Sequence, residues 1–180
     1  MKLKTIQAIM KQSRLIQLIN ADTGEQWITD GYAAYPLRGL PEMKLANLQS
    51  FFDMTDKQWD KVSAKFGNID VCLDDTDDTE KDTEYSPVTI TYYGTTFKPI
   101  MCGNICYYVQ SKYLKPFSED ALYTIRTDTA GKPCIAVREG FFLCGIIMPI
   151  GQTEGFVKDV KTMIEATQPV QEAESKEDEE

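Results

Sequence analysis

The sequence predicts an α+β domain built mostly from antiparallel sheet, and three observations support this class. The chain has 180 residues, 42% of them hydrophobic, which is enough for one sizeable core. Runs rich in Val, Ile, Thr and Tyr alternate with Gly-containing turns, as in strands joined by hairpins. Shorter stretches show apolar residues at helical spacing instead. We therefore expect a single domain over residues 1–151 with two or three packed helices.

The chain is expected to begin with a helix and a hairpin. Apolar residues recur at helical spacing over residues 3–10, which predicts a short amphipathic helix with a basic edge. The β-rich runs 14–20 and 25–37 flank the turn cluster Ala21–Gly24, which predicts a hairpin. A further turn or bulge is expected at Asp30-Gly31.

Two more helices are expected over residues 43–66. In residues 43–54 the large apolar side chains, Leu48 and Phe52 among them, share one face. A second helix is expected to start after Thr55, a favourable N-cap residue, and to continue to Phe66.

The net charge of −9 is unevenly distributed along the chain. Residues 1–65 and 85–150 each carry a net charge of +2, whereas residues 66–84 carry −7 and residues 151–180 carry −6. Blocks of like charge usually stay solvated. We therefore expect a flexible acidic insertion at about residues 70–84.

The second half of the domain is expected to consist mainly of strands. Residues 86–109 are dense in Thr, Tyr, Ile and Val and predict two or three strands. A short helix is expected over residues 111–117, followed by strands at 121–128, 133–139 and 141–150. The last strand is apolar enough to be buried on both faces.

The C-terminal residues are expected to form a helix and then a disordered tail. Residues 152–167 contain one apolar stripe, which predicts an amphipathic helix. Residues 168–180 are acidic and have no aromatic residue, so they cannot bury enough apolar surface to fold.

Composition excludes several classes of function. The chain has no His, which removes the usual general base near neutral pH, the Ser-His and Cys-His pairs and the commonest zinc ligand. Its five Cys lack paired Cys-x-x-Cys spacing, so neither a zinc site nor a disulfide framework is expected. The longest apolar runs are shorter than the roughly 20 residues of a membrane span. We expect a cytoplasmic protein with no membrane association, no catalytic centre, no metal and no cofactor.

Two stretches carry motifs of one known family. The first is Trp27–Ala34 with Leu40-Pro41 downstream, which is similar to a recurrent Ala-Thr-Asp-Gly-His/Tyr-Arg-Leu-Ala strand turn. The second, residues 110–150, contains a Lys-Tyr-Leu helix, a penultimate strand and a closing strand that ends in Ile-Met-Pro. In this order they resemble a domain of the bacterial DNA sliding clamp, the β subunit of the replicative polymerase.

The sequence also departs from that family. Ala33 stands where the family usually has Arg, and Gly151 stands where a basic residue is expected after the closing strand. The chain is too short for the three tandem domains of the clamp. The resemblance therefore implies one clamp-like domain, and a ring would require several identical chains in head-to-tail contact. The alternative is a monomer that keeps the fold and has lost the ring.

The resemblance implies two binding surfaces and no enzymatic activity. A sliding clamp encircles duplex DNA with basic helices, so the attraction is electrostatic and weakly dependent on sequence. The residues expected on that surface are Lys4, Lys11, Arg14 and Lys44, with Lys112 and Lys115 as further candidates. The closing strand of the family borders an apolar pocket for short segments of polymerases and repair proteins. That comparison places Ile146, Met148, Pro149 and Ile150 at such a pocket.

Each of these residues also has an ordinary structural interpretation. The lysines are typical of solvated helix surfaces, and Met148 is typical of a side chain that fills the core under a strand. Two other functions stay open. One is an acidic regulatory or decoy protein, such as a phage or mobile element encodes, that binds a basic protein partner. The other is an enzyme that holds a divalent ion with the carboxylates of Asp74 to Asp82.

Overall fold

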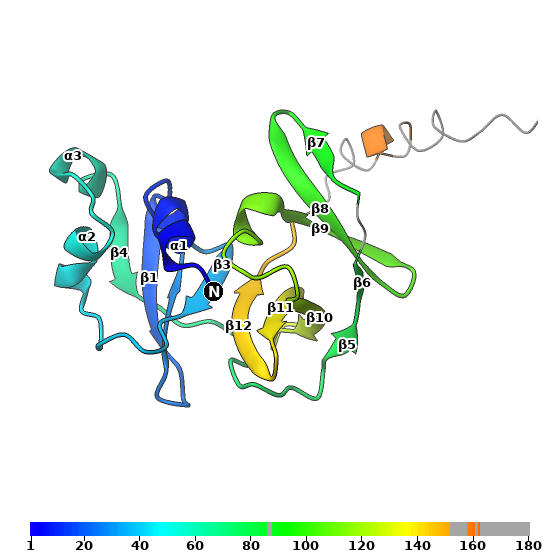
Figure 1. Ribbon diagram of the computed structural model, residues 1–180, viewed down its shortest axis with the longest axis horizontal. Coiled ribbons are helices and arrows are strands. Elements are labelled where there is room, and N and C mark those ends of the chain that lie inside the picture. Colours follow the sequence, from blue (N-terminus) through cyan, green and yellow to red (C-terminus); the bar gives the residue numbers. More distant parts are fainter. Residues whose placement is uncertain (86–87, 152–157, 161, 163–180) are drawn as a thin grey trace, which may run out of the picture. The chain divides into compact units, whose positions relative to one another are not determined.

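The structure is a computed structural model that describes residues 1–85, 88–151, 158–160 and 162. Its first compact unit comprises Met1–Ile150 and is α+β with mostly antiparallel sheet, as the sequence predicts (Figure 1).

The second compact unit comprises Gly151–Glu180. Its described residues 158–160 and 162 are helical. The rest of the helix expected over residues 152–167, and the whole of the tail expected over residues 168–180, lie outside the described residues.

The larger sheet of the described chain has eight strands. They are β1 (Leu15–Asn20), β2 (Gln26–Thr29), β3 (Ala33–Pro36), β4 (Ser63–Phe66), β5 (Lys81–Asp82), β10 (Leu122–Thr127), β11 (Pro133–Glu139) and β12 (Phe142–Ile147). Their order across the sheet is β4-β1-β2-β3-β12-β11-β10-β5. All neighbouring strands are antiparallel except β1 and β4, which are parallel.

This sheet is assembled from two similar halves. In each half a helical segment precedes a three-stranded antiparallel meander: α1 (Leu3–Met10) precedes β1 to β3, and the 3-10 helix η2 (Ser111–Tyr113) precedes β10 to β12. The halves join through their third strands, with Ile146 opposite Ala34. Segments far apart in the sequence therefore meet in the middle of the sheet.

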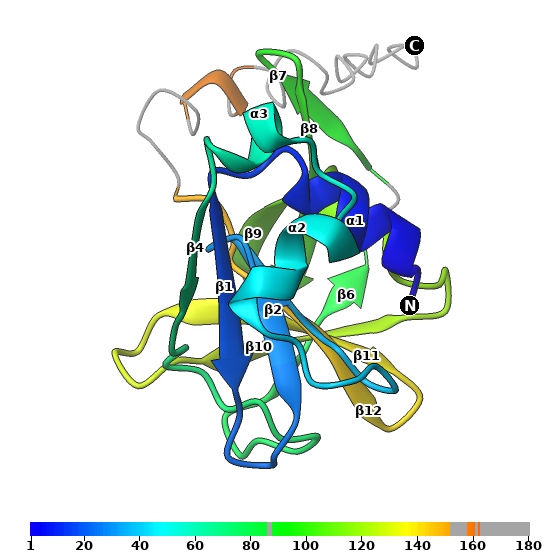
Figure 2. The same cartoon turned by 90° about the vertical axis from the view of Figure 1, so that its left-hand side faces the viewer.

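One face of the sheet, which we call the helix face, is covered by helices and by a smaller sheet. The other helical segments are η1 (Leu45–Asn47), α2 (Leu48–Phe51) and α3 (Asp56–Trp59). Figure 2 shows α1 and α2 on this face, where Gln7 Nε2 donates to the Phe51 carbonyl at 2.8 Å. The largest side chains buried here are Ile6, Met10, Ile16, Leu18, Ile28, Tyr35, Leu48, Phe52, Ile100 and Ile135.

The smaller sheet consists of β6 (Glu84–Tyr85), β7 (Ile90–Tyr92), β8 (Thr95–Cys102) and β9 (Ile105–Gln110). The central strand β8 pairs antiparallel with each of the other three. The strands expected over residues 86–109 are thus present as β7, β8 and β9. Ile100 and Val109 from this sheet join the core of the helix face.

The opposite face of the larger sheet, which we call the outer face, is covered by residues 67–80, the crossing segment. The Gly67 N–H donates to the Leu18 carbonyl at 2.9 Å, and the Asp70 carbonyl accepts the Thr129 N–H at 3.0 Å. The segment therefore runs from β1 to the turn between β10 and β11. Its buried side chains Val71 and Leu73 form a second core with the sheet residues Ile19, Trp27, Ala34, Cys134, Ala136, Leu143 and Ile146.

The expected helix from Thr55 to Phe66 was wrong in its second half. α3 ends at Trp59, and Ser63–Phe66 form β4. The Ser63 N–H donates to the Arg14 carbonyl at 2.8 Å, which starts the parallel pairing with β1. Because tertiary pairing satisfies this backbone, it overrides the helical spacing of the apolar side chains.

The acidic segment at residues 70–84 is less solvated than its composition suggested. Two of its apolar side chains, Val71 and Leu73, are buried against the outer face. It also contains the short strand β5, which pairs with β10 through Lys81 and Asp82. Buried apolar and exposed residues alternate only at its start, over residues 70–74, so this part packs on the sheet while most of the carboxylates of the segment stay near the surface.

Candidate functional site

The turn between β2 and β3 holds a buried carboxylate. Asp30 is only 5% exposed, and its Oδ1 accepts the backbone N–H groups of Tyr32 and Ala33, both at 3.0 Å. Gly31 adopts a φ of +89°, which residues with a side chain rarely adopt. The turn thereby fixes the position of Tyr32, whose side chain is 59% exposed.

The same carboxylate joins this turn to η2. The Tyr113 hydroxyl donates to Asp30 Oδ2 at 2.9 Å, and the Tyr35 hydroxyl donates to the Tyr113 carbonyl at 3.2 Å. Burial, the charge of Asp30 and this hydrogen bond together raise the pKa of Tyr113 well above its ordinary value. Tyr113 therefore stays protonated and keeps its role as donor. The Tyr32 ring stacks on it at 6.2 Å between centroids.

The last strand, β12, leaves the sheet beside this turn. The Met148 N–H donates to the Tyr32 carbonyl at 2.8 Å. Gly145 lies against the Phe117 ring, and a Cβ there would overlap that ring and come within 3.3 Å of the Ala34 carbonyl oxygen. Glycine is therefore needed for β12 to approach β3 and the Phe117 ring this closely.

A cavity of about 110 Å³, which we call the anchor cavity, opens on the outer face where the turn and β12 meet. It is lined by Gln17, Thr29, Gly31, Tyr32, Ala33, Ala34, Asn68, Ile69, Ile146 and Met148. Of the four residues that the resemblance places at a peptide pocket, Ile146 and Met148 line this cavity, whereas Pro149 and Ile150 do not. The Ile150 N–H donates instead to the Tyr108 carbonyl at 2.8 Å.

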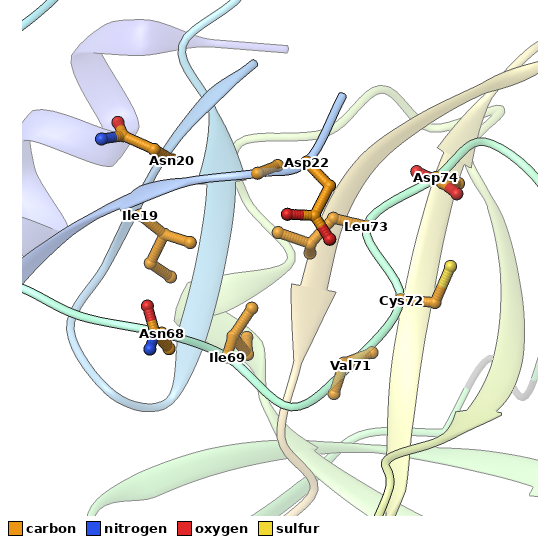
Figure 3. Close-up of a pocket in the computed structure, with 10 residues that line it drawn as sticks. Ile19, Asn20, Asp22, Asn68, Ile69, Val71, Cys72, Leu73 and Asp74 are labelled. Carbon is orange, nitrogen blue, oxygen red and sulfur yellow. The ribbon is translucent and has the colours of Figure 1, made fainter. Parts of the chain in front are cut away.

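A larger cavity of about 370 Å³, which we call the acidic cavity, adjoins the first (Figure 3). It is lined by Ile19, Asn20, Ala21, Asp22, Asn68, Ile69, Val71, Cys72, Leu73 and Asp74. Asn68 and Ile69 line both cavities, so the two share a wall formed by the crossing segment. Among the residues that the structure describes, no Lys or Arg lines either cavity.

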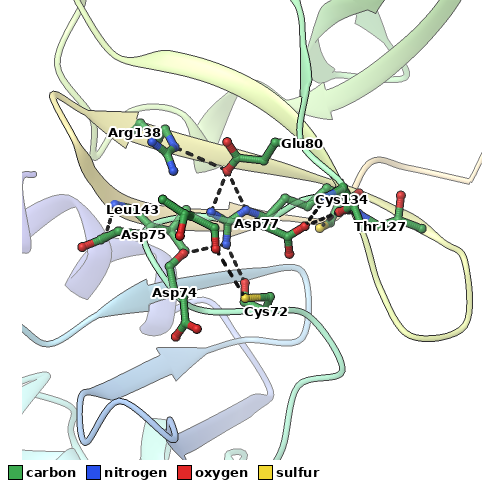
Figure 4. A network of polar contacts seen from close by, with 12 residues as sticks. Cys72, Asp74, Asp75, Asp77, Glu80, Thr127, Cys134, Arg138 and Leu143 are labelled. Atoms are coloured by element: carbon green, nitrogen blue, oxygen red, sulfur yellow. Dashed lines mark hydrogen bonds and ion pairs between the residues drawn. The ribbon is translucent and has the colours of Figure 1, made fainter.

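A buried arginine holds the crossing segment in place (Figure 4). Arg126 is fully buried, and its Nη1 donates to the carbonyls of Cys72 and Asp74 at 2.7 and 2.8 Å. Its Nε donates to Glu80 Oε1 at 2.7 Å, and Nη2 lies 2.6 Å from the same oxygen as an ion pair rather than as a well-directed hydrogen bond. Arg138 Nε is 3.4 Å from that oxygen. A single side chain thus fixes both ends of residues 72–80.

Asp75 adds a second tie between the crossing segment and the sheet. Its Oδ1 accepts the Leu143 N–H at 2.7 Å and pairs with Arg38 Nη2 at 3.1 Å. Partial burial opposes ionisation of this carboxyl, but the bonds from Leu143 and Arg38 outweigh it and hold the pKa of Asp75 below its usual value.

The basic residues expected to face DNA are spread over the helix layer. Lys4, Arg14 and Lys44 are exposed, whereas Lys11 pairs with Asp53 at 3.1 Å. Lys112 Nζ lies 4.6 Å from the centroid of the Tyr113 ring, and Lys115 is exposed. The start of α1 lies next to the segment that carries Lys112 and Lys115, because the Lys2 N–H donates to the Pro116 carbonyl at 2.6 Å.

Three of the six carboxylates between Asp74 and Asp82 are engaged with the protein. Asp75 and Glu80 have the partners given above, and Asp77 accepts the Thr79 N–H at 2.7 Å. In the part of the chain that the structure describes, no three His, Cys, Asp or Glu side chains are grouped so that they could hold a metal ion. The five cysteines, all in the described part of the chain, form no disulfide.

The chain matches no family model, no curated protein and no solved structure. Within residues 1–85, 88–151, 158–160 and 162, no helix has the length and apolar character needed to cross a membrane.

Sequence reasoning found part of the anchor cavity and missed the rest. It singled out Ile146 and Met148 through the closing strand, and Tyr32 to Ala34 through the turn motif. It gave no indication that these stretches meet, or that Ile69 closes the cavity from the crossing segment. The alternation of Ile69, Val71 and Leu73 in an acidic block is the one pattern that indicates a segment packed on one side.

Proposed function

We propose that this chain is a non-enzymatic accessory protein of DNA replication or repair, similar to one domain of a sliding clamp, which binds a short apolar segment of a partner protein in the anchor cavity. The observation that carries the proposal is the junction of the two stretches that resemble the clamp. They are far apart in sequence, yet the Met148 N–H bonds the Tyr32 carbonyl and both residues line one cavity.

The chemistry of the anchor cavity suits a single apolar side chain. Ile69, Ile146 and Met148 supply apolar walls, and no charged residue in the described part of the chain lines the cavity. Burial of one Leu or Phe side chain contributes about 1.5–3 kcal/mol. Methionine adapts its shape to different partners. One anchor of this size supports a weak, exchangeable contact with several related partner segments.

The rigidity of the cavity rim also supports binding. Tyr32 is held through its own backbone by Asp30 and through its ring by Tyr113. Little side-chain freedom is left to lose when a ligand packs against this ring, which favours affinity.

The test uses the full chain and a pool of short fluorescein-labelled peptides that differ only in one Leu, Phe or Ser residue. We expect the Leu and Phe peptides to bind more tightly than the Ser peptide in fluorescence polarisation. Met148→Lys should reduce their binding at least 10-fold by placing a charge in an apolar cavity. Met101→Lys, on the smaller sheet, is the matched control and should leave binding unchanged. Equal binding by the Ser peptide, or no effect of Met148→Lys, would contradict the proposal.

A second activity, contact with duplex DNA by a self-assembled ring, is favoured by two observations. The bond from Lys2 to Pro116 sets the exposed Lys4 beside the turn that carries Lys115. The sheet also ends in β4 and β5, each paired on one side within the described chain. Because the two edges differ, β4 of one chain and β5 of the next are suited to pair in head-to-tail contact.

Light scattering after size-exclusion chromatography tests the ring. We expect a closed oligomer of the full chain and DNA binding that weakens steeply with added salt. If the chain is a strict monomer and does not bind DNA at low salt, the proposed ring is contradicted and only the proposed peptide binding stands.

A further inference from the structure

The acidic cavity has the chemistry of a site for a cationic side chain. Two carboxylates, Asp22 and Asp74, line it, and no Lys or Arg does. Among the described residues neither carboxylate has a hydrogen-bond or ion-pair partner, whereas Asp75 and Glu80 nearby are bound to Arg38 and Arg126. The cavity therefore has two uncompensated negative charges at its rim.

The floor of the acidic cavity suits the aliphatic part of such a side chain. Ile19, Val71 and Leu73 line it beside the carboxylates. Lys and Arg lay their methylene groups along apolar surface and keep the charged head near water. A small inorganic cation would use the two carboxylates and leave this apolar floor without a function.

The acidic cavity continues the anchor cavity in one direction. Asn68 and Ile69 line both, and the chain runs from Gln17 on β1, which lines the anchor cavity, to Ala21, which follows the end of β1 at Asn20 and lines the acidic cavity. Four residues of extended chain span about 13 Å at roughly 3.3 Å per residue. An extended peptide that follows β1 covers the same distance with the same number of residues.

We propose that the acidic cavity binds a Lys or Arg side chain of the same partner segment whose apolar side chain fills the anchor cavity, about four residues away along an extended chain. This inference rests on the proposed peptide-binding function, which it makes more specific. The preferred partner is thus a short basic and apolar segment, and an acidic residue at that position is disfavoured.

The experiment compares three pairs of fluorescein-labelled peptides on the full chain by fluorescence polarisation. All have one Leu in an otherwise uncharged Ser and Thr background. The pairs carry Arg, Ala or Glu, placed four residues before the Leu in one member and four residues after it in the other. We expect affinity to fall in the order Arg, Ala, Glu, with about a 5-fold preference for Arg over Ala that disappears at high salt. The double variant Asp22→Asn/Asp74→Asn should abolish this preference and leave the affinity of the Ala peptide unchanged.

The matched control is Asp60→Asn/Asp78→Asn, which removes the same net charge from exposed positions that line neither cavity. It should retain the preference for Arg. If the Ala peptide binds in a Met148-dependent manner but Arg gives no advantage, or if both double variants reduce that advantage equally, the inference is overturned and the proposed function stands. If no peptide binds, or if Met148→Lys leaves peptide binding unchanged, the proposed function and this inference are both contradicted.

Discussion

The two faces of the eight-stranded sheet are covered in different ways. The helix face is sealed by large, fully buried side chains, among them Met10 of α1, Phe52 directly after α2 and Ile100 of the smaller sheet. The outer face is covered by the crossing segment, which contributes two buried apolar side chains and depends on Arg126 for its position. Both cavities discussed above lie against this second cover.

The difference in cover suggests that the helix face serves mainly to stabilise the fold and the outer face serves binding. A face packed by several elements has few voids and stabilises the fold. A face covered by one irregular segment leaves room between side chains, because the backbone of that segment bends to reach its polar ties. Substitutions should therefore affect the two faces differently, those on the helix face changing stability and those on the outer face changing binding.

The largest expected effect is on the helix face. Phe52→Ala removes a fully buried ring and should lower the free energy of unfolding by about 3–5 kcal/mol. Phe141→Ala, at a position 89% exposed, should change it by no more than about 0.5 kcal/mol. Urea denaturation measures both. Similar effects of the two substitutions would contradict the assignment of the main core to the helix face.

A somewhat smaller effect is expected on the outer face, with a different consequence. Arg126→Ala leaves the Cys72 and Asp74 carbonyls and Glu80 without their partner and should cost about 3 kcal/mol. Amide exchange should rise first in residues 67–80, and peptide affinity should fall. Lys132→Ala, an exposed substitution on the adjoining turn, serves as control. Uniform loss of protection over the whole sheet would show that the crossing segment is no separate layer.

The smallest expected effect concerns pH. Since the folded-state pKa of Asp75 is depressed, its ion pair and hydrogen bond stabilise the fold above the unfolded pKa, and this contribution is lost as pH falls through the folded value. Asp75→Asn should therefore be less stable than wild type at neutral pH, by less than about 1 kcal/mol because the site is partly exposed. The difference should shrink as pH falls below the ordinary Asp pKa of about 3.9 and through the lower folded-state pKa, measured by urea denaturation across pH. If the difference in stability between wild type and Asp75→Asn does not change with pH, Asp75 stabilises the fold by packing and not by its charge.

Local patterns predicted much of the fold. The helix Leu3–Met10 has the predicted bounds because its apolar spacing alone determines which side faces the sheet. The strands at β1, β2, β10, β11 and β12 follow from runs of β-favouring residues between turns. The burial of β12 on both faces is also as expected, with Ile146 in one core and Ile147 in the other.

The failures arose where distant contacts decide the structure. Ser63–Phe66 have helical spacing with Trp59, but the Arg14 carbonyl draws them into the sheet. Arg126 lies in a strand with no local sign of burial, because its partners are carbonyls more than 50 positions away. The anchor cavity needs Tyr32, Ile69 and Met148 together, and no local pattern contains all three.

The most direct test of peptide binding at the outer face is a methyl NMR spectrum of the full chain, labelled at Ile and Met, during titration with a Leu-containing peptide. The account predicts that the methyl signals of Ile69, Ile146 and Met148 shift first, while those of Met10 and Ile100 on the helix face stay in place. Shifts confined to the helix face, or none at saturating peptide, would contradict it.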